Sequence, residues 1–334
     1  MKLLVIGGTG LISTAITRLL VEQHDVTLYN RGQRETSTVG ATRLLGDRTD
    51  HATFERQMVE AGTFDCVIDM VGYTPEDGES VVRAFQGRVG QFIFCSTVDV
   101  YKKPASRYPY TEDEEYGGLN TYSRNKVAIE QRLWQAAEDK AFPLTVIRPA
   151  ATYGEGRGPL SPLSGPNMYI DRLRKGKPII VHGDGSSLWV SCYRDDVARA
   201  FVAAAGNQRT LGHAYHTTGE EWLTWDIYHQ QVAEAIGAPP PTIVHIPTDV
   251  LVSAAPKRAA IIGENFQYHN IFNNTAASHD LDFRYTTTWK DGVRRMVAHL
   301  DDHGLIRNSD HDALEDRLID AWRQSERALR DLEV

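Results

Sequence analysis

Short apolar segments alternate with helical patterns through the first half of the chain. The predicted strands cover Lys2–Ile6, Asp25–Tyr29, Cys66–Val71, Gln91–Ser96 and Leu144–Arg148. Apolar residues spaced along one face predict helices between them, over Leu11–Glu22, Asp77–Phe85 and Tyr122–Lys140. Strands separated by helices form parallel sheets, and right-handed crossovers place the helices on both faces. The sequence therefore predicts an α/β fold with a doubly wound parallel sheet.

The pattern changes near residue 154. A stretch rich in glycine, proline and serine, residues 156–166, predicts a loop. Beyond it we expect strands at Pro178–Val181, His213–His216 and Ile243–Ile246, and helices at Asp195–Ala205, Thr224–Ile236 and Asp312–Leu332. We expect a first domain over residues 1–153, to which part of the second half returns. Residues 154–334 are expected to form mainly a smaller α/β lobe with C-terminal helices.

Composition excludes several classes of protein. The 334 residues are 41% hydrophobic and 24% charged, which is typical of a soluble globular protein. No apolar run approaches the ~20 residues that span a bilayer. The net charge of −8 argues against a generic nucleic-acid binder. Three cysteines without a Cys-x-x-Cys motif are typical of a reduced, cytoplasmic protein. His299 and His303 lack a third ligand, so we predict no metal site.

A glycine-rich turn joins the first predicted strand to the first helix. Its sequence is Gly7-Gly8-Thr9-Gly10-Leu11-Ile12-Ser13. Backbone amides in such a turn approach a pyrophosphate, and the helix N-terminus adds a positive partial charge. We therefore predict a dinucleotide site, with a Rossmann-type sheet and contacts from Gly7, Thr9, Gly10, Leu11 and Ile12.

The second strand does not end in the carboxylate that usually binds the ribose 2′-hydroxyl. Asn30 and Arg31 follow it, and Arg34 lies close by. Guanidinium groups favour a 2′-phosphate, so NADP is preferred over NAD, although Arg31 could instead be a solvated loop charge. Asp47 is placed to accept a hydrogen bond from an adenine amino group, or is a turn aspartate. Arg48, beside it, is included in the predicted cofactor site.

Tyr122 and Lys126 lie four residues apart at the start of a helix, so they share one helix face. A free tyrosine has a pKa of ~10, and a nearby ammonium favours its phenolate. Tyr122 is therefore a candidate acid/base for moving a hydroxyl proton during hydride transfer. Thr97 follows an apolar strand, where α/β sheets bind ligands, and could polarise the substrate oxygen.

The chain resembles the extended short-chain dehydrogenases/reductases, the NAD(P)-dependent epimerase/dehydratase group. The motifs that carry the resemblance include the glycine turn, Asp47, Ser96-Thr97, Tyr122/Lys126, Arg148-Pro149, Gly183-Asp184-Gly185 and Asp195-Asp196-Val197-Ala198. The resemblance implies a catalytic set of Thr97, Tyr122 and Lys126. It further implies cofactor contacts from Val71, Gly72, Tyr73, Ser96, Pro149 and Ala150, and a homodimer formed through the helices at Asp77–Phe85 and Tyr122–Lys140.

Three positions depart from the family pattern. Ser13 replaces the third glycine of the turn, which leaves cofactor binding plausible. Trp189 stands where members that act on nucleotide sugars carry an arginine, and an indole cannot neutralise a diphosphate. Arg157, Arg172 or Arg258 could replace that cation. Asp99 stands where related dehydratases carry a catalytic glutamate, and could be a base, a structural group or a substrate ligand.

We predict an enzyme that oxidises a secondary alcohol of a sugar or sugar-like polyol to a ketone, either as product or as intermediate. The predicted substrate contacts are Asn167, Tyr169, Trp189 and Tyr193 in the second lobe. A sugar dehydratase that uses Asp99 as base is one alternative. Others are an NADP-sensing regulator, and an RNA-associated protein of the chloroplast stem-loop-binding type, which shares the fold and an Asn-Arg-Gly after its second strand.

Overall fold

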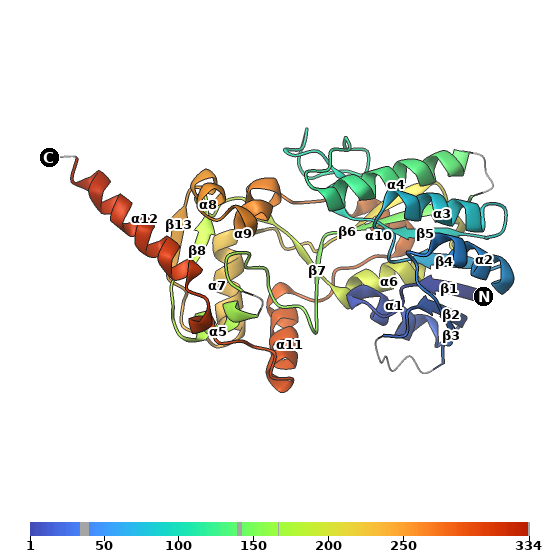
Figure 1. The fold of residues 1–334 in the computed structure, drawn as a ribbon, viewed down its shortest axis with the longest axis horizontal. Helices are drawn as coiled ribbons and strands as arrows, with labels where there is room; N and C mark the ends of the chain where they lie inside the picture. The colour runs from blue at the N-terminus through green and yellow to red at the C-terminus, as the bar shows by residue number, and fades with distance from the viewer. Residues whose placement is uncertain (34–39, 139–141, 166, 333–334) are drawn as a thin grey trace. The chain divides into compact units, whose positions relative to one another are not determined.

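The computed structural model describes residues 1–33, 40–138, 142–165 and 167–332. It divides into two compact units (Figure 1). Unit 1 comprises Met1–Thr152, Cys192–Gly219 and Phe272–Thr286. Unit 2 comprises Tyr153–Ser191, Glu220–Ile271 and Thr287–Val334. The chain thus leaves unit 1 after Thr152 and returns to it twice, at Cys192 and at Phe272.

Unit 1 is built on a seven-stranded parallel sheet. In spatial order its strands are β3 (Thr42–Leu45), β2 (Asp25–Asn30), β1 (Lys2–Ile6), β4 (Cys66–Asp69), β5 (Phe92–Cys95), β6 (Leu144–Pro149) and β11 (His213–Thr217). Every neighbouring pair is parallel. The strand order reverses between β1 and β4, where such sheets bind ligands at the carboxyl ends of their strands. The predicted doubly wound fold is confirmed.

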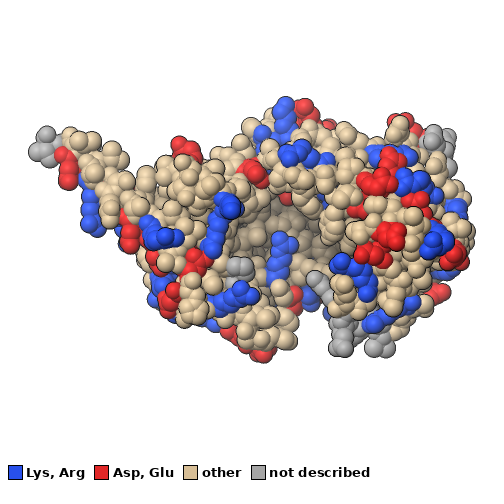
Figure 2. Space-filling model, in the orientation of Figure 1, with Lys and Arg blue, Asp and Glu red and all other residues tan. Residues whose placement is uncertain are grey.

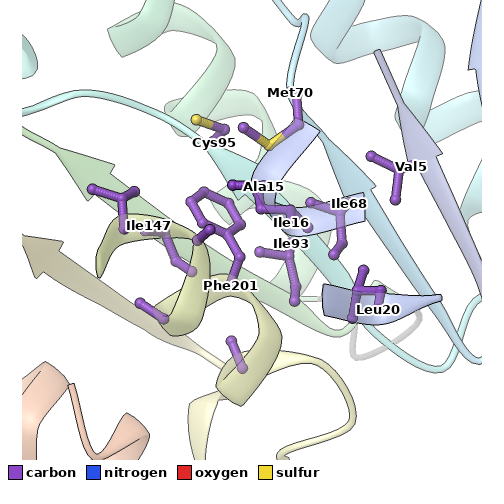
Figure 3. Close-up of a cluster of buried hydrophobic side chains, with 14 of the residues drawn as sticks. Val5, Ala15, Ile16, Leu20, Ile68, Met70, Ile93, Cys95, Ile147 and Phe201 are labelled. Atoms are coloured by element: carbon purple, nitrogen blue, oxygen red, sulfur yellow. The ribbon is translucent and has the colours of Figure 1, made fainter. Parts of the chain in front are cut away.

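Helices cover both faces of this sheet (Figure 1). One face carries α1 (Leu11–Leu20), α6 (Arg194–Ala204) and α10 (Thr275–Leu281), and the other carries α2 (His51–Ala61), α3 (Pro75–Phe85) and α4 (Thr121–Glu138). Successive residues of β1 point to opposite faces, so Val5 joins the first core and Ile6 the second. Figure 3 shows the first core, where Ile16 and Phe201 pack over the strand residues.

Unit 2 has smaller sheets and a separate core. Its elements are α5 (Met168–Arg174), β8 (Ile179–His182), β9 (Leu188–Trp189), β12 (Leu223–Thr224), α7 (Trp225–Ala235), β13 (Ile243–Ile246), α8 (Thr248–Ala254), α9 (Pro256–Ile261), α11 (Trp289–Asp302) and α12 (Leu314–Arg330). Strands β8 and β13 pair in parallel, and β9 and β12 pair antiparallel. A further pair, β7 (Ala151–Tyr153) with β10 (Ser191–Tyr193), consists mostly of unit 1 residues. Stacked aromatic rings, among them Trp225 and Phe266 at 4.8 Å, fill the core.

Candidate active site

The glycine turn lies between β1 and α1, as predicted. Gly7 and Gly8 have φ angles of +107° and +58°, which residues with a side chain rarely adopt. A Cβ on Gly7 would stand 2.8 Å from a Val71 methyl group. The Ser13 hydroxyl accepts a hydrogen bond from the Gly10 amide at 2.7 Å, so the departure from glycine here helps to hold the turn. Such a turn at a helix N-terminus fits a pyrophosphate.

The residues after β2 and β3 leave room for the predicted adenosine contacts. The Asn30 side chain accepts a hydrogen bond from the Gly32 amide at 2.9 Å, and Arg31 is exposed. Asp47 is also exposed, and its hydrogen bonds from the Thr49 amide and hydroxyl hold the pKa of its carboxyl below the usual value. Arg34 lies outside the described residues. Both exposed groups, one cationic and one anionic, remain predicted cofactor contacts.

Arg48 is buried. Its guanidinium donates to the Asp77 carbonyl at 2.6 Å, lies 4.2 Å from the centre of the Phe54 ring and stands 4.0 Å from the Asp69 carboxylate. These contacts tie the segment after β3 to α2, α3 and the end of β4. The side chain is therefore engaged inside unit 1, and a cofactor contact from this position stays a prediction.

The loop after β4 holds the predicted cofactor residues Val71, Gly72 and Tyr73. The Tyr73 amide donates to the Asp77 carboxylate at 2.9 Å, and the Tyr73 carbonyl accepts from the Asn125 side chain at 2.9 Å. A Cβ on Gly72 would stand 2.9 Å from the Phe94 ring. The loop is thus fixed from two helices, by Asp77 of α3 and Asn125 of α4.

Thr97 and Tyr122 are brought together at the carboxyl end of β5. The Tyr122 hydroxyl is hydrogen-bonded to Thr97, whose side-chain oxygen also accepts from the Asp99 amide at 3.2 Å. The Tyr122 side chain is 43% exposed, so it is accessible from solvent. Burial of the hydroxyl, with the Cys95 thiol and the Asp99 carboxylate close by, raises the pKa of Tyr122 above its usual value.

Lys126 lies one helical turn beyond Tyr122 and is buried. Its ammonium donates to the Cys95 carbonyl at 2.7 Å and lies 4.6 Å and 5.9 Å from the centres of the Phe94 and Tyr122 rings. Burial lowers the pKa of Lys126. The expected lowering of the Tyr122 pKa by Lys126 is not found. The effect of burial on the hydroxyl is larger, and the ammonium hydrogen bond goes to a backbone carbonyl.

Two carboxylates that support this site were not identified from the sequence. Asp77 had been read only as the start of a helix, yet it organises the loop after β4. Glu130 stands four residues beyond Lys126, on the same helix face, and forms a buried ion pair with Arg148. Its spacing was visible in the sequence, but nothing there showed which arginine would meet it.

The other predicted cofactor contacts lie at the ends of strands and at the start of α1. Ser96 follows β5, Pro149 ends β6 and Ala150 follows it. Thr9 precedes α1, and Leu11 and Ile12 begin that helix.

Two of the four predicted substrate residues line a cavity of about 700 Å³ within unit 2. Asn167 and Tyr169 stand at its wall, beside the loop of residues 156–165. Trp189 is buried against Trp225, with ring centres 5.0 Å apart, and its indole nitrogen has no hydrogen-bond partner among the described residues. Tyr193 is also buried. A substrate contact from any of the four stays a prediction, although burial favours a core role for Trp189.

The three alternative cations differ in their availability. Arg172 is buried and pairs with Glu315 at 3.5 Å and with a neighbouring aspartate. Arg258 pairs with Asp312 at 2.5 Å. Arg157 is exposed at the wall of the unit 2 cavity and forms no ion pair within the described residues. Of the three arginines, Arg157 is the one available to an anionic ligand.

The part of the chain that the structure describes contains neither a cluster of metal ligands nor a membrane-spanning helix. The rings of His299 and His303 lie 4.0 Å apart at the end of α11. No group of three or more His, Cys, Asp or Glu side chains there could hold a metal ion. None of the described helices is long and apolar enough to cross a membrane. The three cysteines, at positions 66, 95 and 192, are buried and form no disulfide bond within the described residues.

Comparison with known proteins shows what this chain is similar to. Residues 79–217 match the model of the NAD dependent epimerase/dehydratase family. The chain is 30% identical over 259 residues to the chloroplast stem-loop binding protein of 41 kDa b of Arabidopsis thaliana, a match that covers 73% of this chain and 65% of that protein. It is 27% identical over 243 residues to 2'-dehydrokanamycin reductase of Streptomyces kanamyceticus, covering 72% of this chain and 68% of the reductase.

A third relative is the UDP-glucose 4-epimerase of Mycolicibacterium smegmatis, 28% identical over 275 residues, with 74% of this chain and 86% of the epimerase covered. The fold is similar to that of the epimerase Mth375 of Methanothermobacter thermautotrophicus, with a TM-score of 0.74, 18% identity, and coverage of 92% and 94%. The strand order, the glycine turn and these matches agree. Residues 79–217 are similar to the NAD dependent epimerase/dehydratase family, and the fold is similar to that of a solved epimerase, in agreement with the resemblance to the extended short-chain dehydrogenases/reductases.

Proposed function

We propose that this protein oxidises a secondary alcohol of a sugar or sugar-like polyol to a ketone, with Thr97, Tyr122 and Lys126 as its catalytic set. The observation that carries the proposal is the hydrogen bond between Tyr122 and Thr97, with Lys126 buried one helical turn away. The ketone is either released, as in a dehydrogenase, or reduced again from its other face, as in an epimerase.

Each of the three side chains has a distinct task. Tyr122 takes the proton of the substrate hydroxyl during oxidation and returns it during reduction. Thr97 shares a hydrogen bond with Tyr122 and polarises the same substrate oxygen. Lys126 places a positive charge one helical turn from Tyr122, and in the free protein its effect on the hydroxyl is smaller than that of burial. When bound, a nicotinamide dinucleotide supplies the group that accepts or donates hydride.

The cofactor preference rests on Arg31. The exposed guanidinium follows a strand without the usual terminal carboxylate, so it favours the 2′-phosphate of NADP. We expect Arg31→Ala to raise the Kd of NADP about tenfold or more and to leave the Kd of NAD within about twofold, since a charge-assisted hydrogen bond contributes ~1.5–3 kcal/mol. Fluorescence titration measures both constants. Arg56→Ala, which removes an exposed guanidinium from α2, is the control, and equal effects on both cofactors would contradict the assignment.

The substrate class rests on Trp189 and on the relatives. Relatives act on UDP-glucose and on 2'-dehydrokanamycin, so the family accepts both a nucleotide sugar and a glycoside. Trp189 offers no charge to a diphosphate, and two of the alternative arginines are paired internally. We therefore favour a free sugar, glycoside or other polyol. A nucleotide sugar would have to use Arg157.

Absorbance at 340 nm tests the proposal. The protein, with excess NADP or NAD, is offered a panel of free sugars, glycosides and nucleotide sugars. Sustained growth beyond one reduced cofactor per active site identifies a net dehydrogenase and its substrate class. A signal that stops below one equivalent while the sugar changes identifies an epimerase or a dehydratase. No reduction and no sugar conversion across the panel would contradict the proposal.

An RNA-associated role is the second candidate, because a chloroplast stem-loop binding protein is 30% identical to the chain. The net charge of −8 argues against it, and basic and acidic side chains are interspersed on the face that Figure 2 draws. Filter binding at low salt with a stem-loop RNA distinguishes the two roles. Salt-sensitive retention would support an RNA role, and absence of retention at low salt would remove it.

A further inference from the structure

A buried carboxylate lies behind the proposed catalytic set. Glu130 is fully buried in α4. One of its oxygens accepts hydrogen bonds from the Ser96 hydroxyl and, at 3.0 Å, from Arg148 Nε. The other accepts from the Tyr116 hydroxyl at 2.7 Å and from Arg148 at 2.5 Å. Each oxygen of the carboxylate therefore accepts two hydrogen bonds.

Arg148 of β6 completes this cluster. Its guanidinium also donates to the Tyr101 hydroxyl at 2.7 Å and to the Glu112 carbonyl at 2.9 Å. The Tyr101 hydroxyl in turn contacts a ring nitrogen of His216 in β11, at 2.5 Å. Burial opposes the charge of Glu130, yet Arg148 holds the pKa of Glu130 below its usual value. The pair is thus a charged, fully hydrogen-bonded group inside unit 1.

The cluster reaches both halves of the catalytic set. Ser96 immediately precedes Thr97 at the end of β5. Tyr122, Lys126 and Glu130 are spaced four residues apart, so they follow one face of α4. One carboxylate therefore fixes the exit of β5 against the helix that carries the tyrosine and the lysine. Removing a partner from such a buried pair leaves an uncompensated charge, so the arrangement is held tightly.

We propose that the Glu130–Arg148 pair positions Thr97 against Tyr122 and Lys126, so that the three side chains keep one productive geometry. Neither Glu130 nor Arg148 has a chemical step of its own, so both are positioning residues. The inference rests on the proposed function, because it assigns the geometry that the proposed oxidation requires. A displacement of 1 Å in such a site costs up to ~10²-fold in rate.

Ser96→Ala is the mildest test, because it removes one hydrogen bond and leaves the Glu130–Arg148 pair in place. We expect kcat to fall about tenfold, and any change in the KM of the cofactor, which Ser96 is predicted to contact, to be smaller than the change in kcat. Ser96→Thr, which keeps a hydroxyl, should restore most of the rate. A wild-type kcat in Ser96→Ala, or a loss confined to cofactor KM, would overturn the inference.

Glu130→Gln adds a readout that a purely structural role would not move. The acidic groups near Lys126 are the Cys95 thiol of β5, whose raised pKa keeps it neutral at neutral pH, and the carboxyl groups of Asp69 in β4, Asp77 in α3 and Glu130 itself. Only the last is neutralised in Glu130→Gln, so the pKa of Lys126 falls. The alkaline limb of the pH–kcat profile should therefore move to lower pH. An unmoved limb in a folded variant would contradict the assignment.

Amide hydrogen exchange tests the same inference without any substrate. Ser96→Ala should speed exchange in residues 97–101 and 121–126, at the two halves of the site. Gln91→Met is the matched control. Gln91 is a buried polar hub at the opposite end of β5, where its amide nitrogen donates to Thr145, Thr210 and the Ala204 carbonyl. The control should loosen its own surroundings and leave 97–101 and 121–126 protected.

The two failures are distinguishable. If wild-type protein turns over no substrate but Ser96→Ala loosens both segments, the proposed function fails and the positioning role of the pair stands. If turnover is found and exchange in 97–101 and 121–126 is unchanged in Ser96→Ala, the positioning role fails and the proposed function stands.

Discussion

The protonation state of Tyr122 decides the direction in which the site works best. Burial raises the pKa of its hydroxyl, so the side chain is a neutral phenol at neutral pH. A neutral phenol can donate a proton to a carbonyl, but it must first lose its proton to act as a base. For the proposed reaction we therefore expect the free protein to favour ketone reduction at neutral pH, and oxidation to depend on deprotonation of Tyr122.

This gives a pH prediction for the two directions. The initial rate of alcohol oxidation should rise with pH between about 7 and 9, by up to about tenfold per pH unit, as the phenolate fraction grows. The initial rate of ketone reduction should stay level over the same interval, because the phenol remains protonated. Stopped-flow absorbance at saturating cofactor measures both. An oxidation rate that is flat with pH would contradict the assignment of Tyr122 as base.

His229 gives a stability prediction in unit 2. It is buried beside the Tyr169 hydroxyl at 2.6 Å, and burial lowers its pKa to about 3. Below pH ~6.5 this histidine is protonated in the unfolded chain but stays neutral in the folded chain. The free energy of unfolding therefore decreases as the pH is lowered. His229→Gln should reduce that slope by up to about 1.4 kcal/mol per pH unit between pH 6 and 5.

Urea unfolding at several pH values measures the slope for His229→Gln. The exposed His311→Gln is the control and should leave the slope as in the wild type. An unchanged slope in His229→Gln would mean that the unfolded and folded states bind this proton equally.

At the scale of the element, the start of α3 organises the cofactor loop. The Asp77 carboxylate accepts from the amides of Tyr73 and Thr74, both at 2.9 Å, and contacts His51 at 2.9 Å. Burial opposes its charge, but these hydrogen bonds hold the pKa of Asp77 below the usual value. One helix cap thus fixes a loop that is predicted to line the cofactor.

Asp77→Asn tests that role. An amide keeps the size of the side chain but can accept on one side only, so the loop should loosen. We expect the Kd of the cofactor to rise about three- to tenfold and stability to fall by ~1–3 kcal/mol. Calorimetric titration and thermal unfolding give the two numbers. Asp50→Asn, which alters the exposed cap of α2, is the control and should lower stability without changing the Kd.

Some helices and strands can be predicted from the sequence with their observed bounds, and others cannot. The strands at Lys2–Ile6 and Ile243–Ile246 were predicted with their observed bounds, because apolar runs bordered by turn residues are distinctive. The elements that the sequence does not predict include helices α2, α5, α8, α9 and α10, strand β3, and the short strands β7, β9, β10 and β12. Strand β3 is short and largely exposed, so it carries little apolar pattern. Such elements are formed by their neighbours, as β3 is by pairing with β2.

The features of the candidate site also fall into those that are local in the sequence and those that depend on tertiary packing. The glycine turn and the Tyr122/Lys126 spacing are local, so the sequence predicted both. The meeting of Thr97 with Tyr122 depends on how β5 and α4 pack, and was available only through the family resemblance. The Glu130–Arg148 pair joins residues on α4 and β6, and nothing local to either marks the other. Burial, which sets the direction of the Tyr122 pKa, also arises only from the tertiary fold.

At the scale of the molecule, the residues proposed for catalysis lie in unit 1, and Trp189 and Arg157, on which the proposed substrate class rests, lie in unit 2. The sheet, its strand order and the catalytic set belong to unit 1, whereas Trp189, Arg157 and the cavity belong to unit 2. Relatives with the same sheet include an epimerase, a reductase and a stem-loop binding protein. Function therefore depends on side chains placed on a shared fold. The homodimer remains a prediction, which light scattering tests.

The most direct test of the account is the kcat of Tyr122→Phe against wild type, with the best substrate of the panel at saturating cofactor. The account predicts a fall of at least about 10²-fold, because the phenol is the group that moves the proton, with the Kd of the cofactor within about twofold of wild type. Tyr268→Phe in unit 2 is the control and should keep its activity. A Tyr122→Phe enzyme that retains wild-type kcat would contradict the central claim.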